Sequence, residues 1–296
     1  MTDVAVLMTP FLDLTFLGLD ELPPLGGERY ATDLIRSPGG GAITATGTAR
    51  LGLDTALAVP LGDDPSGAFL AAALRADGVR LVAPHAGVTA TTVVMPTRGE
   101  RTFVTFDPGA PARCSDVEAL APRAVVCGLA HLDHLADGTE AYVSIGDHEA
   151  RCYAQRLPET LSGHTLIVNE AEALHLTGAG DSEQAARALA EHAVAAVVTV
   201  GPRGAIAVAD GELHAASGVD AGLAVDTTGA GDLFTAAYVW AALRGMPAAE
   251  RLQWAALYAS LSVTVATATA GAITESQLIE EAARRGLPAA PTAKES

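Results

Sequence analysis

The chain has 296 residues, of which 49% are hydrophobic and 4% aromatic, so its length suits one large α/β domain or two small ones with a sizeable core. The 35 acidic residues outnumber the 18 basic ones and give a formal charge of -17, which argues against a nucleic-acid or anionic-membrane partner. Cys114, Cys127 and Cys152 lie far apart, which fits neither a zinc site nor a disulfide framework and favours a reducing cytoplasm.

The first predicted elements alternate between strands and helices. The N-terminal run MTDVAVLMTPFLDLTF is expected to form a first strand that ends near Asp13, and GAITATGTARLG a helix that Gly52 closes. DTALAVPLG is expected to be a strand. The run SGAFLAAALRADG predicts a helix that begins with Ser66 as its N-cap and stops at Gly78.

Two β-rich runs around a turn at Gly99, TATTVVMPT and RTFVTFD, predict a hairpin. The alternation then resumes with AVVCGLAHL, YVSIGD, TLIVN, AVVTVG and LAVDTTG as successive candidate strands. Such alternation predicts a mostly parallel sheet with helices on both faces. No linker or repeat divides residues 1–296, so we expect a single domain, with a small β lid built from residues of about 14–36 and 89–106.

One stretch of the chain is long enough to cross a membrane, because no charged residue falls between Leu252 and Thr274. It consists mostly of Ala, Thr and Ser, however, and its hydrophobicity is weak. A buried helix packed against the sheet is the better interpretation, and we expect a cytoplasmic protein without a membrane partner.

Lysine usage excludes several enzyme classes. Lys294 is the only lysine of the chain, and it lies three residues from the end. A Walker A loop, a protein kinase and a pyridoxal enzyme each need a lysine in the active site. No G-x-G-x-x-G follows a predicted strand either, so a dinucleotide site of the usual kind is not expected.

The pentapeptide TGAGD occurs twice, and the surroundings of the two copies differ. The first copy, Thr177–Asp181, follows the helical run NEAEALHL and precedes the amphipathic run SEQAARALAEHA. Gly178 therefore stands where a helix C-cap glycine belongs, and Asp181 or Ser182 can cap the next helix. We interpret this copy as a connector between two helices.

The second copy, Thr228–Asp232, is predicted to follow a strand, GLAVDTT, and to precede an almost wholly apolar helix, LFTAAYVWAALRG. The N-terminus of such a helix carries a partial positive charge at the carboxyl edge of the sheet, where ligands gather. Gly229 and Gly231 let the backbone approach an anion closely. Asp232 then places a carboxylate beside an anion-binding turn, so this copy is the candidate site.

The segment DTTGAGDLFTAAYV resembles the C-terminal signature of the ribokinase-like, PfkB-type carbohydrate kinases. Further segments are similar to other family motifs: PGGGAITATGTARLG with LGDDPSG to the N-terminal signature, GERTF to the lid hairpin, NEAE to the N-x-x-E motif, and VTVGPRGA to the nucleotide-binding strand and turn. The resemblance covers nearly the whole chain. It implies a three-layer αβα sandwich with a β lid, and ATP-dependent phosphorylation of a sugar-like alcohol.

The resemblance also implies roles in catalysis. Asp232 matches the base that takes the proton of the acceptor hydroxyl, and the N–H groups of Gly229, Ala230, Gly231 and Asp232 would stabilise charge on the transferred phosphoryl group. These N–H groups would do what lysine does in a P-loop, which accounts for the missing lysine.

Other positions match the nucleotide, metal and acceptor contacts of the family. Asn169 and Glu172 match the motif that organises Mg²⁺ through water. Asp226 and Thr228 match the loop that binds K⁺ in potassium-activated members. The nucleotide contacts fall on Thr199, Gly201 and Gly204. The acceptor contacts fall on Asp13, Gly39, Gly40, the position of Ile43, and Arg101 of the lid hairpin.

One position departs from the family pattern. The asparagine that usually binds a sugar hydroxyl falls on Ile43, or on Thr44 if the loop shifts. Ile43 cannot form a hydrogen bond, so an acceptor with one hydroxyl fewer, or with an apolar portion such as a nucleoside base, becomes more plausible. Small-molecule acceptor and ATP are the expected partners, with a homodimer through the lid as a further expectation.

Two rival functions remain open. A superfamily relative that phosphorylates a vitamin-like hydroxymethyl compound would lack the N-terminal sugar signature, and a non-catalytic sugar- or nucleotide-binding module would be expected to lose Asp232. His131 and His134 are interpreted as ordinary loop residues, because no third metal ligand is near. Asp63 and Asp64 are expected to be solvated capping acids of a strand–helix turn.

Overall fold

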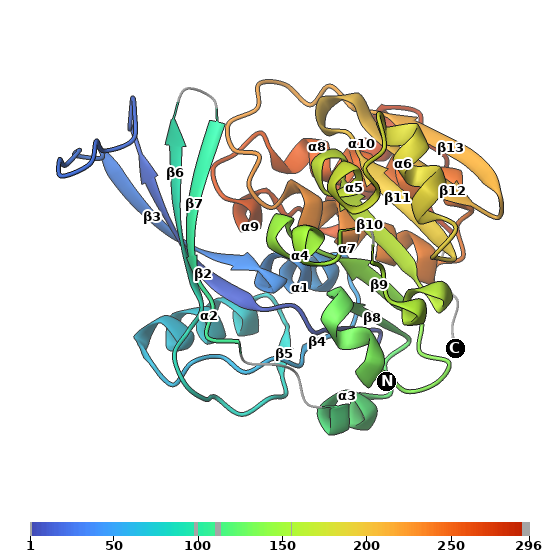
Figure 1. Cartoon of the computed structure of the whole chain (residues 1–296), viewed down its shortest axis with the longest axis horizontal. Helices are drawn as coiled ribbons and strands as arrows, with labels where there is room; N and C mark the ends of the chain where they lie inside the picture. The colour runs from blue at the N-terminus through green and yellow to red at the C-terminus, as the bar shows by residue number, and fades with distance from the viewer. Residues whose placement is uncertain (1, 98–99, 110–113, 155, 292–296) are drawn as a thin grey trace.

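A computed structural model describes residues 2–291 except 98–99, 110–113 and 155. The predicted turn at Gly99 and the single lysine, Lys294, lie outside the described residues. In the described part of the chain, two sheets form: a nine-stranded sheet in the body and a four-stranded sheet that projects from it as a lid (Figure 1).

The body sheet has the order β13-β12-β11-β10-β9-β8-β1-β4-β5. Its strands from β11 to β5 are parallel, and β12 and β13 add an antiparallel edge. The bounds are β1 Val4–Val6, β4 Thr55–Leu57, β5 Arg80–Leu81, β8 Ala124–Cys127, β9 Ala141–Ser144, β10 Thr165–Asn169, β11 Ala195–Thr199, β12 Gly204–Ala209 and β13 Glu212–Ser217.

Alternate residues of these strands face two separate hydrophobic clusters, because successive side chains of a strand point to opposite faces. Val4 and Val6 of β1 belong to the cluster under one helical layer, and Ala5 to the cluster under the other. The first layer contains α1 Gly41–Arg50, α2 Pro65–Ala76, α7 Ala230–Leu243, α8 Ala248–Ser262, α9 Ala268–Gly271 and α10 Glu275–Arg284. The second contains α3 Cys114–Leu120, α4 Asp147–Cys152, α5 Glu170–Thr177, α6 Ser182–Leu189 and the 3₁₀ turns η1 Leu129–His134 and η2 Glu159–Gly163. The predicted three-layer α/β sandwich is confirmed.

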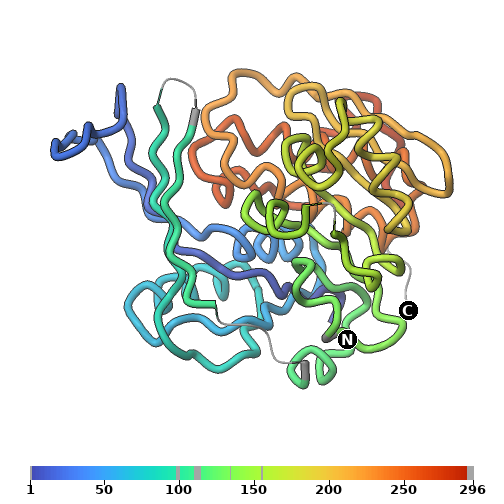
Figure 2. The backbone as a smooth tube through the Cα atoms, viewed as in Figure 1, coloured from blue at the N-terminus to red at the C-terminus, as the bar shows by residue number. Residues whose placement is uncertain are grey.

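The lid sheet has the order β3-β2-β6-β7, with β2 and β6 parallel and the other pairs antiparallel. Its strands are β2 Pro10–Leu17, β3 Asp33–Gly40, β6 Thr91–Thr97 and β7 Glu100–Phe106. The backbone trace shows the four strands leaving the body together on one side, away from the two chain ends (Figure 2). The expected lid hairpin is confirmed, whereas the first lid segment is longer than residues 14–36, since β2 begins at Pro10 and β3 ends at Gly40.

Three predicted details of the secondary structure in the N-terminal half of the chain are wrong. The N-terminal run is two strands in different sheets, because Pro10 lacks the N–H that a continuing ladder requires and instead starts β2. Asp13 therefore lies in the middle of a lid strand. Helix α2 begins at Pro65, not after Ser66, and its N-cap is Asp64, whose carboxylate accepts the Gly67 N–H over 2.8 Å.

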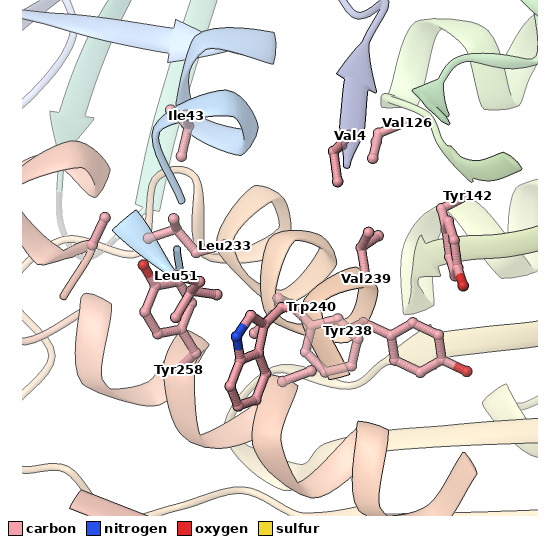
Figure 3. Packing of buried hydrophobic residues seen from close by; sticks show 14 of the residues in the cluster. Val4, Ile43, Leu51, Val126, Tyr142, Leu233, Tyr238, Val239, Trp240 and Tyr258 are labelled. Atoms are coloured by element: carbon pink, nitrogen blue, oxygen red, sulfur yellow. The ribbon is translucent and has the colours of Figure 1, made fainter. Parts of the chain in front are cut away.

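Helix α7 is buried through most of its length and anchors the core. Tyr238 and Trp240 are fully covered (Figure 3). The Trp240 ring packs against Trp254 of α8 with 5.2 Å between centroids. Buried aromatic side chains of this size remove a large apolar area from water. The N-terminus of α7 is therefore held on a rigid support at the carboxyl edge of the parallel strands.

The uncharged stretch before Thr274 forms α8 and the short α9, and α8 packs against α7, β12 and β13. In the residues that the structure covers, no helix has both the length and the hydrophobicity needed to span a bilayer. The predicted buried helix on the sheet is confirmed, with its end at Ser262.

Candidate active site

Three cavities meet at the N-terminus of α7. The central cavity, of about 710 Å³, follows the carboxyl ends of the strands, and the lid cavity, of about 280 Å³, lies against β2, β6 and β7. The third, here the α8 cavity, has about 480 Å³ and runs along α8. Asp232 lines the central and lid cavities, and Gly231 lines the central and α8 cavities. The second TGAGD therefore lies where all three spaces adjoin.

Helix α7 begins at this junction without a side-chain cap. Its N-cap is Gly229, in a left-handed conformation with φ 72°. A Cβ atom at Gly229 would lie 2.5 Å from the Ala268 Cβ and 2.6 Å from the Ile43 Cδ1, so glycine is required for space as well as for conformation. Uncapped N–H groups and the helix dipole together favour an anion, here beside Gly229 and Gly231, whereas the Ala230 N–H donates to the Thr227 carbonyl over 3.4 Å.

The segment before this helix is not the predicted strand. Residues 221–229 form a loop in which Leu223 is 87% and Val225 is 59% exposed. The apolar residues of this segment predicted a strand. The N–H groups of Val225 and Asp226, however, both donate to the Val263 carbonyl after α8 and not to a strand of the sheet. The structure still places Asp232 in the first turn of α7, as expected.

The Asp232 carboxyl has an unusual environment. Burial raises its pKa to about 7, and a hydrogen bond from Thr44 Oγ1 to Asp232 Oδ1, 3.2 Å long, acts in the opposite direction. A carboxylate with a pKa near neutrality, in a cavity, is typical of functional sites.

Asp13 lines the lid cavity together with Asp232. Asp13 is buried, and burial followed by the charges of Asp232 and Asp226 raises its pKa to about 7. The neighbouring strand β3 leaves room for the carboxylate only because Gly39 has no side chain, since a Cβ there would lie 2.1 Å from Asp13 Oδ1. Gly40, with φ 54°, lines both the central and the lid cavity.

Ile43 and Thr44, the two residues where the sequence departs from the family pattern, make different contacts. Ile43 lines the lid cavity beside Phe11 and Phe103, and the Thr44 hydroxyl donates to Asp232. Ile43 therefore presents hydrocarbon where the resemblance implied an amide, and Thr44 does not take over that place.

Asn169 and Glu172 form the first turn of α5 at the end of β10. They make a reciprocal capping box: Asn169 Oδ1 accepts the Glu172 N–H over 2.9 Å, and Glu172 Oε2 accepts the Asn169 N–H over 2.8 Å. Burial raises the pKa of Glu172 to about 7, and both side chains line the central cavity.

These residues suit Mg²⁺ and not a metal that needs a full protein cage. No cluster of three or more His, Cys, Asp or Glu side chains that could hold a metal occurs in the described ranges. Mg²⁺ is usually held by one or two carboxylates together with waters and substrate phosphates, so a single oxygen donor such as Glu172 fits. His131, which was expected to be an ordinary loop residue, lies in the 3₁₀ turn η1 and lines the central cavity.

The predicted nucleotide residues flank a tight turn at the end of β11. Thr199 lines the central and α8 cavities, and Gly201 and Gly204, with φ 59° and 103°, line the α8 cavity on either side of η3 Gly201–Arg203. A Cβ at Gly204 would lie 2.0 Å from the Ala216 carbonyl oxygen, so the turn requires glycine.

Sequence reasoning missed the opposite wall of the α8 cavity. This wall comes from α8, through Ala256, Ala259 and Ser260, and from the loop after β13. The signal was present in the run of small uncharged residues after Leu252, which we interpreted only as packing.

Asp226, Thr228 and Arg101 form one connected group. Asp226 Oδ1 accepts the Thr228 N–H over 2.9 Å, and Asp226 Oδ2 accepts the Thr267 N–H over 3.0 Å. Arg101 reaches from β7 and donates to Thr228 Oγ1 over 3.1 Å. Arg101 lines the lid cavity, but the partners of its guanidinium are the protein residues Thr228 and Asp226.

The first TGAGD lies in a connector, as predicted. Gly178 ends α5 in a left-handed conformation with φ 69°, and Asp181 caps α6 by accepting the Gln184 N–H over 2.8 Å. Neither residue lines any of the three cavities.

The fold is a three-layer sandwich with a β lid, and a carboxylate lies at the uncapped N-terminus of α7, where the lid, central and α8 cavities adjoin. This arrangement is that of a phosphotransferase that acts on an alcohol. Residues 24–275 match the pfkB family of carbohydrate kinases, and the chain belongs to this family. A search of curated proteins finds no match.

Solved structures resemble the chain over nearly its full length. Ribokinase from Arabidopsis thaliana, solved with ribose and ATP, is 25% identical with a TM-score of 0.78, over 95% of this chain and 99% of that chain. Adenosine kinase from Sinorhizobium meliloti is 21% identical with a TM-score of 0.77, over 96% and 99% of the two chains. A protein described as ribokinase II from E. coli, solved with ATP and Mg²⁺, is 20% identical with a TM-score of 0.76, over 96% and 100%.

Proposed function

We propose that the chain is an ATP-dependent kinase that transfers the γ-phosphoryl group to a hydroxyl of a sugar or nucleoside. The observation that carries this proposal is the position of Asp232, in the first turn of α7 and on the wall shared by the lid and central cavities. An acceptor in the lid cavity would present its hydroxyl to this carboxylate, with the phosphates of ATP on the other side.

Asp232 acts as the general base. It orients the acceptor hydroxyl and takes its proton as the new O–P bond forms and the bond to the ADP leaving group breaks. Because phosphoryl transfer passes through a loose transition state, positioning contributes more than prior deprotonation. The raised pKa of Asp232 makes it a stronger base than an exposed aspartate.

The N–H groups at the start of α7 stabilise the transferred group. Charge on its oxygens develops beside Gly229 and Gly231, where the donors are already oriented and need no reorganisation. Mg²⁺, held through water by Glu172 and Asn169, would neutralise phosphate charge in the central cavity.

The acceptor is bound by the lid cavity. Asp13 offers two carboxylate oxygens to neighbouring hydroxyls, and Gly39 and Gly40 bring backbone groups close to the same place. Ile43, Phe11 and Phe103 give the cavity an apolar wall. This wall favours an acceptor with an apolar portion, such as a nucleoside base, over a pentose with hydroxyls on every side.

The α8 cavity is proposed to hold the adenine of ATP. Small side chains of α8 and glycines beside η3 line this cavity, which adjoins Gly231. The phosphates would then extend from Gly231 into the central cavity, past Thr199 and Asn169.

A coupled ADP-release assay tests the proposal most economically. The panel contains pentoses, hexoses, nucleosides and hydroxymethyl vitamin precursors, each with ATP and Mg²⁺. Turnover of a sugar or nucleoside supports the assignment, and turnover of the vitamin precursors alone supports the rival superfamily relative. Binding of ATP without turnover of any acceptor would favour a non-catalytic binding module.

Calorimetry with Asp13→Asn tests the acceptor site separately. The variant should bind the acceptor far more weakly and ATP almost unchanged, because Asp13 lines the lid cavity and neither of the other two. Equal losses for both ligands would refute the assignment of Asp13.

A homodimer through the lid also stays a prediction. Phe103, Val104 and Phe106 of β7 are 50%, 61% and 55% exposed, which is unusual for three large apolar side chains on one strand. Light scattering after size-exclusion chromatography would give the mass of a dimer, and Val104→Lys should shift it toward the monomer.

A further inference from the structure

Arg101 connects the lid to the catalytic turn. It lies on β7, paired with Pro96 of β6, and its guanidinium donates from Nη1 to Thr228 Oγ1 over 3.1 Å. The same Nη1 lies 3.9 Å from Asp226 Oδ1, and both side chains of this ion pair are largely shielded from solvent. Thr228 directly precedes Gly229, the N-cap of α7, so the contact ends one residue from the proposed anion site.

Asp226 holds the turn from the other side. Its two carboxylate oxygens accept the N–H groups of Thr228 and Thr267, and its own N–H donates to the Val263 carbonyl. Val263 lines the α8 cavity. A chain of polar contacts therefore runs from the lid, through Arg101 and Asp226, to the wall of the proposed adenine site.

A monovalent cation at Asp226 and Thr228 does not fit this arrangement. Such an ion would use the two residues that the Arg101 guanidinium already contacts. Two positive charges beside one partly buried carboxylate repel each other, and the guanidinium is fixed by its hydrogen bond to Thr228. The sequence-based expectation of a K⁺ site at Asp226 and Thr228 therefore disagrees with the position of Arg101.

We propose that Arg101 is a positioning residue that supplies, from the lid, the positive charge that holds the Asp226–Thr228 turn, so that the reaction needs no monovalent cation. Arg101 also lines the lid cavity together with Asp13, so the residue that holds the turn borders the space proposed for the acceptor. The inference rests on the proposed kinase function and assigns Arg101 to the turn rather than to the acceptor.

The kinetic test compares wild type, Arg101→Met and Arg101→Lys in K⁺ and in tetramethylammonium at equal ionic strength and constant Mg²⁺. Wild type should give the same kcat in both salts. In tetramethylammonium, Arg101→Met should lose about tenfold to a hundredfold in kcat, the size expected for a misplaced catalytic group, with little change in the KM of either substrate. K⁺ should restore part of this loss, and Arg101→Lys should keep more activity than Arg101→Met because it keeps the charge.

Arg36→Met is the matched control. Arg36 lies on β3 of the same lid sheet and lines none of the three cavities, so its replacement removes a lid charge without touching the turn. It should leave kcat and the salt response unchanged. Activation of wild type by K⁺, or a loss in Arg101→Met that appears only in the KM of the acceptor, would overturn the proposal.

A binding measurement separates this inference from the proposed function. Calorimetry of ADP binding needs no acceptor and no turnover. Wild type should bind ADP equally in the two salts, whereas Arg101→Met should bind it more weakly in tetramethylammonium than in K⁺. If wild type itself binds ADP more tightly in K⁺, the inference fails whether or not the chain is a kinase. If the Met variant does not fold, the same comparison with Arg101→Lys decides, since Lys should leave ADP binding independent of the salt.

Discussion

Thr44 Oγ1 donates a 3.2 Å hydrogen bond to Asp232 Oδ1, and this bond joins the first helix of the body to the proposed base. Thr44 is fully buried on α1, so its hydroxyl cannot exchange this partner for water. The bond stabilises the charged carboxylate, whereas burial destabilises it. The pKa of Asp232 near 7 is the balance of these two effects.

Thr44→Val should move the acid limb of the pH profile upward. A hydrogen bond to a charged group is worth about 1.5–3 kcal/mol, so its loss should raise the apparent pKa seen in kcat/KM by about one unit or more. The profile is measured from pH 5 to 9. Thr48→Val, on the same helix but bonded to backbone carbonyls and Thr55, is the control and should leave the limb in place. An unchanged limb in Thr44→Val would mean that Asp232 is not the group that titrates.

Asp232→Asn should stabilise the free protein, and more at high pH than at low pH. The carboxyl has a pKa of about 7 when folded and an ordinary value of 3.8 when unfolded. The folded state therefore binds the proton more tightly, and its stability falls as the pH rises from about 4 to about 7, by roughly 1.4 kcal/mol per unit of pKa shift. The Tm difference between variant and wild type should be positive at pH 8 and shrink toward pH 5. A variant that melts below wild type at pH 8 would contradict the burial argument.

Replacing the two glycines at the start of α7, Gly229 and Gly231, by alanine should have different effects on stability and activity. Gly229→Ala places a Cβ against Ala268 and Ile43 at φ 72°, a conformation that costs an L-residue about 1–2 kcal/mol before any clash. It should lower both Tm and kcat. Gly231→Ala meets no neighbouring atom, so it should keep its Tm and lose ATP affinity, because its Cβ points into space shared by two cavities. Equal Tm values for the two variants would count against the packing at Gly229.

Glu172→Gln should raise the Mg²⁺ concentration that gives half-maximal activity by about tenfold or more, the size seen when groups that position metal ligands are changed. The glutamine can still accept the Asn169 N–H, so the capping box should survive and the Tm should not fall. Glu170→Gln, two residues earlier and paired with Arg203 outside the cavities, is the control. A Mg²⁺ titration of Glu172→Gln that overlays that of wild type would remove Glu172 from the metal site.

The sequence predicted the layers of the fold and the position of Asp232, because both follow from local patterns. Buried parallel strands appear in the sequence as apolar runs, and a glycine turn followed by an apolar run marks where a helix begins. The β12–β13 hairpin was missed although Asp210 and Gly211, at φ 52° and 76°, form the D-G turn that signals a hairpin.

Features that depend on contacts between distant segments could not be predicted. The run GLAVDTT has the composition of a strand. A strand forms, however, only where a neighbouring strand offers hydrogen-bond partners, and β13 already occupies that edge of the body sheet. Arg101 was expected at the acceptor from its place in the hairpin. Its contact with Thr228 joins residues 127 positions apart, and no local pattern encodes it.

The kinase activity of Asp232→Asn beside that of Asp181→Asn tests the central claim most directly. Both aspartates end a TGAGD, and both substitutions remove one charge at nearly constant shape. Asp232→Asn should lose about a hundredfold to ten-thousandfold in kcat, as expected when a general base is removed. Asp181→Asn should keep its kcat, because asparagine remains a good N-cap for α6. Similar activity in the two variants would contradict the assignment of Asp232 as the base.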